Sequence, residues 1–510
     1  MPPFLRLAHP LGRPRLVASA TFAAMALAVL PSTALAQASG SAIGGLNPFS
    51  LLQALPSGTG YAALDLCSRA LSVGDDFTRV KLLYTAPKVA PLPLVWTVIH
   101  TTSKVHVTAA LLYPRKAILR PGLGCTVIPP SVSESAVRAQ PFRPAPALPP
   151  DGRSWPLGEG PAETAALSPA RQAVLQKAAQ AMFNEPTTAV NKRVNTNALL
   201  VAQDGRLVYE RYAAPFDRDR QQLGWSMTKT LTALIAGTLE HDGRLSLDGP
   251  VGLPAWQGTD KARITWRQLL NMAPGLQWNE GDYGIGPDDT TNMLFSQADQ
   301  CAWVAAKPLV VAPGTEFNYS TGFSTLALCG VKALLGGSHQ QVYDHYQQRL
   351  FAPLGIRGGH IEPDAAGSPV GGARGMLRPV DWLRLGQLVA QGGQWQGQTL
   401  LSPTFMRFLV GPSPANAGYG GSLWRQPAGT SKRDQRAAVP SLQPSAFPDL
   451  PRDLMDQLPP DMVIFRGVQS QNVVVVPSRG LVLLRMGVAH DPTEADRQTY
   501  QLVIDLLATP

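Results

Sequence analysis

Strand-forming segments stand at both ends of the region from residue 165 to the C-terminus, and this pattern limits the possible folds most. At the start, Leu199–Gln203 and Arg206–Tyr212 flank Asp204-Gly205, a strong signal for a tight β-hairpin. Further strands are predicted near the end of the chain, at Met462–Val468, Asn472–Val476 and Leu481–Val488. We therefore expect an α+β fold in which strands from both ends share one antiparallel sheet. Terminal helices flank this sheet, and the middle of the chain is an inserted helical region.

The rest of the chain divides by composition. Residues 1–36 have the pattern of a signal peptide, and residues 37–128 carry alternating apolar runs that predict a small mixed N-terminal domain. Residues 129–164 are rich in proline and predict a linker. The large domain is expected over residues 165–510.

The N-terminus has three parts that together predict export. Arg6, Arg13 and Arg15 form a positive region, Leu16–Leu30 is apolar but short for a membrane span, and Ala34-Leu35-Ala36 offers small residues for cleavage. The alternative is an uncleaved anchor. Since no later stretch is long and apolar enough to cross a bilayer, we expect a periplasmic or secreted protein without a stable membrane span after processing.

Export gives meaning to the four cysteines, which allow three pairings. Cys67 pairing with Cys125, and Cys301 with Cys329, keeps each disulfide inside one folding unit, and an oxidising compartment supports such bonds. The alternative is four buried free thiols. None of the four has the His and Cys neighbours of a metal site, so no metal or other cofactor is expected.

Charge and composition exclude other classes of protein. Apolar residues make up 45% of the chain and charged residues 15%, which is enough for a large core. The formal net charge is +9, but no long basic run or basic stripe with interleaved aromatic residues occurs. We therefore expect no nucleic-acid partner.

Ser226-Met227-Thr228-Lys229 is the first candidate for chemistry, at the start of a predicted helix. Residues three apart share one helix face, so Ser226 and Lys229 can point into the same cleft. A serine needs a base to become a nucleophile, and a lysine can act as that base when burial lowers its pKa. The alternative is a helix-capping serine beside a solvated lysine.

Two further segments support this candidate. Tyr319 lies in Phe317–Gly322, and a tyrosine hydroxyl close to a lysine can transfer protons. The strand Met462–Val468 leads into Gln469-Ser470-Gln471, whose backbone N–H groups could complete an oxyanion hole. Taken alone, Tyr319 would be interpreted as a hydrogen-bonded core residue and the strand as plain core.

In this order, Ser-x-x-Lys, Tyr-Ser-x and a late strand motif resemble the β-lactamase and penicillin-binding-protein superfamily. The closer likeness is to its class C-like branch, which includes esterases, D-amino-acid amidases and 6-aminohexanoate-oligomer hydrolases. The resemblance covers roughly residues 165–507. It implies that Ser226 is the acylated nucleophile, Lys229 its base and Tyr319 the proton shuttle. The backbone N–H groups of Ser226 and Gln471 would form the oxyanion hole, without a cofactor.

The chain also departs from the superfamily pattern. Val468-Gln469-Ser470 stands where Lys-Thr-Gly or His-x-Gly is usual, and Thr321 stands where Asn is common. Because valine cannot bind a carboxylate, we expect a small ester or uncharged amide as substrate. Residues expected to contact it are Glu280, Tyr283, Val468 and Gln469.

Other functions remain alternatives at this point. The chain could be a β-lactamase, a D-amino-acid peptidase, or a penicillin-binding or sensing module without turnover. An α/β-hydrolase is disfavoured because no Gly-x-Ser-x-Gly motif occurs, and a zinc hydrolase because the histidines are scattered.

Overall fold

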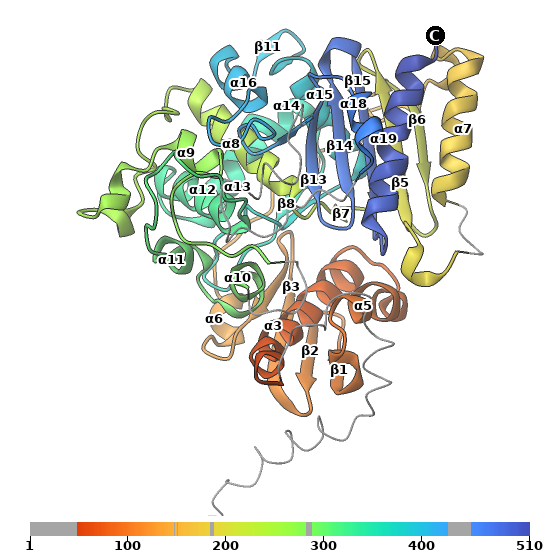
Figure 1. Ribbon diagram of the computed structural model, residues 1–510. Coiled ribbons are helices and arrows are strands. Elements are labelled where there is room, and N and C mark those ends of the chain that lie inside the picture. Colours follow the sequence, from red (N-terminus) through yellow and green to blue (C-terminus); the bar gives the residue numbers. More distant parts are fainter. Residues whose placement is uncertain (1–47, 147, 150, 184–187, 282–287, 427–449) are drawn as a thin grey trace, which may run out of the picture.

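The computed structural model describes residues 48–146, 148–149, 151–183, 188–281, 288–426 and 450–510 (Figure 1). The predicted signal peptide, residues 1–36, lies outside these residues. None of the described helices is long and apolar enough to cross a membrane.

A six-stranded antiparallel sheet joins the two ends of the large domain, as predicted. Its strands in spatial order are β12 (Trp424–Arg425), β13 (Val463–Gly467), β14 (Gln471–Val476), β15 (Leu481–Gly487), β5 (Thr196–Gln203) and β6 (Arg206–Tyr212). The early hairpin meets the late strands where β5 pairs with β15, with Leu200 opposite Leu484. Every residue of β14 and β15 is buried, so these two strands lie at the centre of the core.

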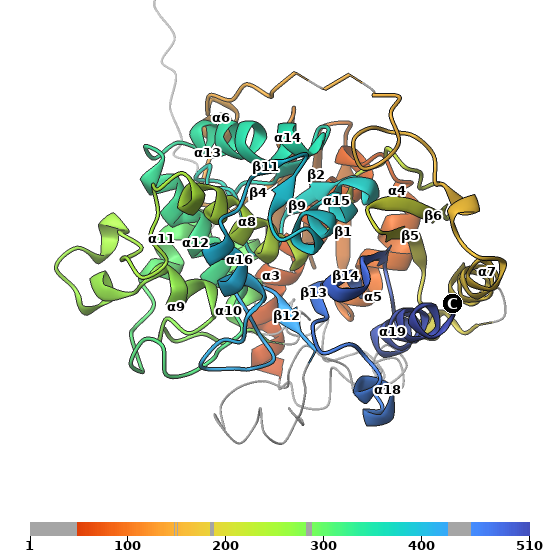
Figure 2. The same ribbon diagram turned by 90° about the horizontal axis from the view of Figure 1, so that it is seen from above.

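Helices cover both faces of this sheet. The terminal helices α7 (Pro169–Phe183) and α19 (Pro492–Ala508) pack together beside β5 and β6 (Figures 1 and 2). On the other face α15 (Pro379–Ala390) packs on β14 and β15. Gly386 permits this close packing, because a Cβ at that position would lie 2.5 Å from Val473 Cγ1.

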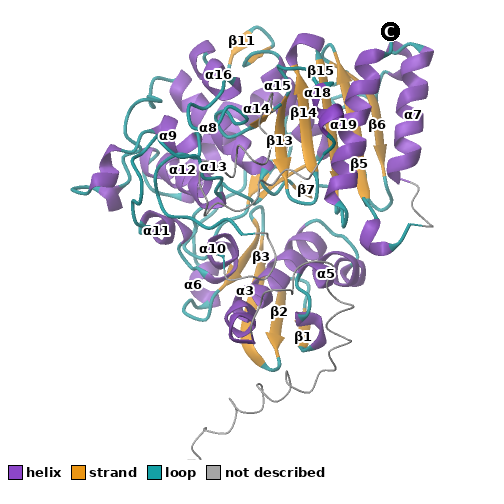
Figure 3. Cartoon of the chain, viewed as in Figure 1, coloured by secondary structure: helices purple, strands orange, loops and turns teal. Residues whose placement is uncertain are grey.

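The inserted middle of the chain is mainly helical (Figure 3). Its helices are α8 (Met227–His241), α9 (Trp266–Leu270), α10 (Asp289–Ser296), α11 (Gln300–Ala305), α12 (Thr321–Leu334), α13 (His339–Tyr346), α14 (Ala352–Leu354) and α16 (Pro403–Val410). The short strands are β7 (Gln222–Leu223), β8 (His360–Ile361), β9 (Gly375–Leu377), β10 (Gln394–Trp395) and β11 (Gln398–Thr399). The Cys301–Cys329 disulfide links α11 to α12, which confirms that predicted pair.

Residues 48–128 are called the N-terminal unit from here on. Its antiparallel sheet runs in the order β1 (Trp96–His100), β2 (Lys104–Ala109), β3 (Leu112–Arg120) and β4 (Gly124–Ile128). The helix α3 (Pro48–Leu66) packs across β2 and β3, and the short helices α4 (Phe77–Arg79) and α5 (Ala86–Lys88) follow it. The predicted Cys67–Cys125 disulfide is present and ties the end of this helical region to β4.

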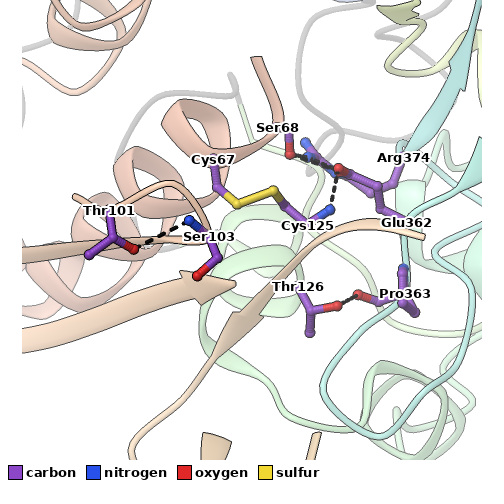
Figure 4. The surroundings of a disulfide bond; sticks show 9 residues. All are labelled: Cys67, Ser68, Thr101, Ser103, Cys125, Thr126, Glu362, Pro363 and Arg374. Carbon is purple, nitrogen blue, oxygen red and sulfur yellow. Dashed lines mark hydrogen bonds and ion pairs between the residues drawn. A yellow bond between two sulfur atoms is a disulfide. The ribbon is translucent and has the colours of Figure 1, made fainter. Parts of the chain in front are cut away.

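The N-terminal unit is docked on the large domain through a buried ion pair (Figure 4). Arg374 and Glu362, both 1% exposed, pair beneath Ser68, whose hydroxyl lies 2.9 Å from Glu362 Oε2. The other oxygen of Glu362 accepts a hydrogen bond from the Cys125 backbone N–H at 2.7 Å. The unit is therefore fixed to the large domain by charged groups that have no access to water.

The proline-rich segment 129–164 begins with α6 (Glu134–Arg138) and then runs along the surface of the large domain. It is anchored there, because Trp155 is 2% exposed and its indole N–H donates to the Val380 carbonyl at 3.4 Å. Arg384 adds a hydrogen bond to the Gly158 carbonyl at 2.6 Å. The helix α18 (Arg452–Asp456) precedes β13 on the far side of the domain.

Candidate active site

Ser226 lies at the N-terminal end of α8 but does not cap it. Its side chain accepts no hydrogen bond from the helix backbone, so the hydroxyl is left for other partners. Trp225, the residue before it, has a φ of 48°, a left-handed conformation that is uncommon for a bulky residue. Ser226 is 8% exposed and Lys229 is 1% exposed. The alternative of a capping serine beside a solvated lysine is therefore wrong.

The Lys229 ammonium lies at the centre of a small polar cluster. Its Nζ is 2.8 Å from Ser226 Oγ, 2.8 Å from Thr321 Oγ1 and 2.9 Å from the Gly372 carbonyl oxygen. Burial lowers the pKa of Lys229 from 10.5 to about 8, and the charge of Glu280 opposes that shift. A lysine with this pKa has a sizeable neutral fraction near neutral pH.

Tyr319 stands over the same ammonium. The Lys229 Nζ lies 4.8 Å from the centre of the tyrosine ring. Burial raises the pKa of Tyr319 above its usual value, the charge of Glu280 raises it further, and a hydrogen bond with Ser226 lowers it. The structure thus brings Tyr319 together with Ser226 and Lys229, from which it lies far along the sequence.

Glu280 lies behind this cluster rather than in the open pocket. Its Oε2 accepts hydrogen bonds from Trp278 Nε1 at 2.6 Å, from Thr290 Oγ1 at 2.7 Å and from the Thr321 backbone N–H at 2.7 Å. Its Oε1 accepts from Thr321 Oγ1 at 2.6 Å. Glu280 is only 8% exposed, so the geometry favours a role within the protein network over the predicted contact with substrate.

Thr321 is the residue that sequence reasoning missed. In the sequence, Thr321 stands out only because it follows Tyr319-Ser320 at a position where asparagine is usual in the superfamily. In the structure it begins α12 and joins Lys229 to Glu280. The next residue, Gly322, lets α12 approach Trp278, since a Cβ there would lie 2.4 Å from the indole ring.

The β13–β14 turn brings Val468 to the site. Gly467 makes this close approach, because a Cβ at that position would lie 2.3 Å from the Gly224 carbonyl oxygen. Gln469 turns away and accepts a hydrogen bond from Arg69 Nη2 of the N-terminal unit at 3.2 Å. Gln471 pairs with Gly467 across the hairpin, and its side chain accepts from the Gly487 backbone N–H at 3.1 Å.

A narrow cavity opens beside Ser226. Its lining is mostly apolar or hydroxylated, and among the described residues Lys88 is the one charged group in it. The lining residues are Tyr61, Lys88, Trp225, Ser226, Thr290, Thr291, Leu294, Phe295, Thr321, Ala373 and Val468. Gln469 and Gln471 are not among them. Tyr283, expected to contact substrate, lies outside the described residues.

No group of three or more His, Cys, Asp or Glu side chains in the described part of the chain could hold a metal ion. The polar cluster at Ser226 is instead built from hydroxyl, amine, phenol and carboxylate groups. Such a set can move protons around a serine oxygen.

Comparison with known proteins places this chain in a family. A protein-family model described as Beta-lactamase matches residues 172–507. Among solved structures, a beta-lactamase/D-alanine carboxypeptidase from Pseudomonas syringae is 16% identical, with 67% of this chain and 100% of that chain covered and a TM-score of 0.48. A penicillin-binding protein homolog from Caulobacter crescentus is 16% identical, with 66% and 98% covered and a TM-score of 0.46. EstCE1, a hydrolase with promiscuous acyltransferase activity, is 17% identical, with 66% and 100% covered and a TM-score of 0.48. Since the family model spans more than half of the sequence, the chain belongs to the Beta-lactamase family of hydrolases.

Proposed function

We propose that this protein is an exported serine hydrolase that cleaves small esters or uncharged linear amides through an acyl-enzyme on Ser226. The observation that carries the proposal is the 2.8 Å distance between Lys229 Nζ and Ser226 Oγ in a buried site. A buried amine with a pKa of about 8 can take the serine proton during attack on a carbonyl.

The hydrogen bonds around Lys229 set the direction of that proton transfer. A neutral lysine amine has two N–H groups and one lone pair. The Gly372 carbonyl can only accept, so it takes one N–H. Thr321 gives its own hydroxyl hydrogen to Glu280, so its oxygen takes the other. The lone pair of Lys229 is then left facing the Ser226 hydroxyl.

Glu280 acts in this scheme as a positioning residue. Because a carboxylate only accepts hydrogen bonds, it fixes the Thr321 hydroxyl as a donor toward itself. Because its hydrogen points to Glu280, the Thr321 oxygen can only accept from Lys229, and this orients the lone pair of Lys229. Without the carboxylate, the chain of hydrogen bonds could reverse, and Lys229 would present N–H to Ser226.

The oxyanion that forms on attack needs two N–H donors close to Ser226. Ser226 and Val468 both line the cavity, and among the described residues neither backbone N–H has a hydrogen-bond acceptor. We therefore assign the second donor to Val468 in place of Gln471, which lies one strand away. Preorganised donors of this kind act where the charge develops.

The reaction follows in two balanced steps. Ser226 Oγ bonds to the carbonyl carbon as its proton passes to Lys229, and the intermediate collapses when the alcohol or amine leaves with a proton relayed through Tyr319. Water then attacks the acyl-enzyme as Lys229 takes one of its protons, and Lys229 returns that proton to Ser226 Oγ as the carboxylic acid is released.

The cavity supports an uncharged substrate. Apart from Lys88, its walls are apolar or hydroxylated, and the cation of Arg466 on β13 is paired with Asp496 of α19. The two disulfides and the signal-like N-terminus support a location outside the cytoplasm.

The test is steady-state hydrolysis of p-nitrophenyl acetate by the purified protein. Ser226→Ala should lower kcat about 10⁴-fold or more, because it removes the nucleophile. Ser103→Ala, an exposed serine in the N-terminal unit, serves as the matched control and should keep full activity. Equal turnover by Ser226→Ala would overturn the proposal, as would a single stoichiometric acylation without release, which indicates a sensing module. Rapid hydrolysis of nitrocefin in place of esters would indicate a β-lactamase.

A further inference from the structure

The cavity beside Ser226 is lined in part by residues outside the family match. Tyr61 and Lys88 belong to the N-terminal unit, whereas the match to the Beta-lactamase family begins at residue 172. The described cavity is therefore formed by two parts of the chain. The cavity is small, with a volume of about 20 Å³, which leaves room for little more than one water molecule.

Tyr61 of α3 is held firmly in that wall. It is 5% exposed, and its ring stacks on Trp225 with 6.1 Å between centroids and 13° between planes. The edge of Phe295 on α10 contacts it from another side, with 5.0 Å between centroids. Since Trp225 directly precedes Ser226, the stack places the Tyr61 ring next to the nucleophile.

The helix that carries Tyr61 cannot swing away easily. Gly60 lies against α10 so closely that a Cβ there would be 2.3 Å from the Phe295 carbonyl oxygen. The buried Arg374–Glu362 pair with Ser68 fixes the end of the same helical region (Figure 4). Arg69 contacts Gln469, the neighbour of Val468. The N-terminal unit thus contacts the neighbours of both proposed oxyanion donors, Trp225 beside Ser226 and Gln469 beside Val468.

The two halves of a substrate can be assigned to the two sides of Ser226. The leaving group must lie toward Tyr319, which returns the proton, and Tyr319 is not among the residues that line the cavity. The acyl group therefore enters the cavity, toward Tyr61 and Phe295.

We infer that the N-terminal unit forms the end wall of the acyl pocket and that Tyr61 limits the substrate to short acyl chains. This inference rests on the proposed function. It gives the N-terminal unit a role in substrate selection and names the substrate class as esters or amides of short, uncharged carboxylic acids.

The experiment compares kcat/KM of the full-length protein on p-nitrophenyl acetate, butyrate and octanoate. The wild type should prefer the short esters. Tyr61→Ala should raise the octanoate-to-acetate ratio about tenfold or more, since a methylene that fits or fails to fit an apolar pocket changes discrimination by at least that factor. Tyr61→Phe keeps the ring and should keep the wild-type ratio. Leu111→Ala changes an exposed residue of the same unit, 82% accessible, and should also leave the ratio unchanged.

A folded Tyr61→Ala variant with a ratio within about twofold of the wild type would overturn the inference. So would an equal shift in Leu111→Ala. If Tyr61→Ala does not fold, Tyr61→Leu retains apolar volume while shortening the side chain, and the same comparison applies.

Labelling with ethyl and octyl fluorophosphonates separates this inference from the proposed function. The labelling rate measures access to Ser226 without turnover. A wild type that is labelled faster by the ethyl reagent but hydrolyses no ester would overturn only the proposed function. A wild type that turns over esters with no preference for chain length would overturn only the inference, and absence of any labelling at Ser226 would overturn both.

Discussion

The hydroxyl of Thr321 donates to Glu280 Oε1 over 2.6 Å, and the same oxygen accepts a hydrogen bond from Lys229. Thr321 thus connects Lys229, the proposed base, to a buried carboxylate.

Changing Glu280 to Gln should lower kcat and shift its pH dependence. The negative charge of Glu280 raises the pKa of Lys229, so its removal should move that pKa, and the midpoint of kcat/KM against pH, downward. The carboxamide can donate as well as accept, so Lys229 also loses its fixed orientation. Glu280→Asp keeps the charge and should retain a midpoint close to the wild type. An unchanged pH profile in Glu280→Gln would remove the positioning role.

Activity of the wild type should depend on the neutral form of Lys229. With a pKa of about 8, the amine is increasingly protonated as pH falls below that value, so kcat/KM should fall with it and level off above it. Lys229→Ala should damage turnover nearly as much as Ser226→Ala, since residues that act as a unit are not additive. Stopped assays with p-nitrophenyl acetate between pH 5 and pH 9 measure the profile. Near-normal activity in Lys229→Ala would exclude it as the base.

Val468→Pro should test the second oxyanion donor. Proline removes the backbone N–H, and loss of one such donor typically lowers kcat by about 10²–10³. Val468→Ala keeps the N–H and should keep kcat within a few-fold. Circular dichroism and the melting temperature show whether the turn still folds. A folded Val468→Pro protein with wild-type kcat would return the assignment to another donor, such as Gln471.

Glu362→Ala should destabilise the protein without touching the nucleophile. Removing one partner of a buried ion pair leaves Arg374 uncompensated, which costs about 3–5 kcal/mol. The matched control is Asp260→Ala, whose partner Arg263 is 80% exposed and whose loss should cost below about 1 kcal/mol. Urea denaturation measures both. Equal midpoints for the two variants would contradict the proposed importance of the buried pair.

Local chemistry was enough to predict the frame of the fold. Asp204-Gly205 marks a hairpin whatever surrounds it, and the structure has β5 and β6 on either side of it. The helix that follows Ser226 has a clear apolar pattern and a clear end, and it is α8. The cysteines could be paired because each pair lies within one unit, and both disulfides formed as expected.

Contacts between distant segments were beyond reach of the sequence pattern. Glu280 is predicted by the family resemblance to contact substrate, because its loop falls where relatives shape the substrate pocket. Its burial depends on Thr290 and Thr321, which no periodicity connects to it. The docking of the N-terminal unit likewise depends on Ser68 meeting Glu362, far along the chain.

The proposed second oxyanion donor could not be predicted from the sequence because its position depends on the geometry of a turn. In the sequence, Val468, Gln469 and Ser470 look like a simple continuation of the predicted strand. In the structure Gln469 and Ser470 have φ values of 64° and 60°, so the chain reverses there, and of these three residues only Val468 lines the described cavity with Ser226. Counting residues along a predicted strand could not locate that reversal.

Tyr61 lines the cavity but lies before the family match, whereas Ser226 lies within it. The cavity is therefore formed by two stretches of sequence. On the inference above, substitutions along α3 change which substrates fit beside Ser226 and leave the groups on α8 and α12 unchanged. The boundary of the family match therefore does not coincide with the boundary of the structure around the cavity, which takes two of its lining residues from before position 172.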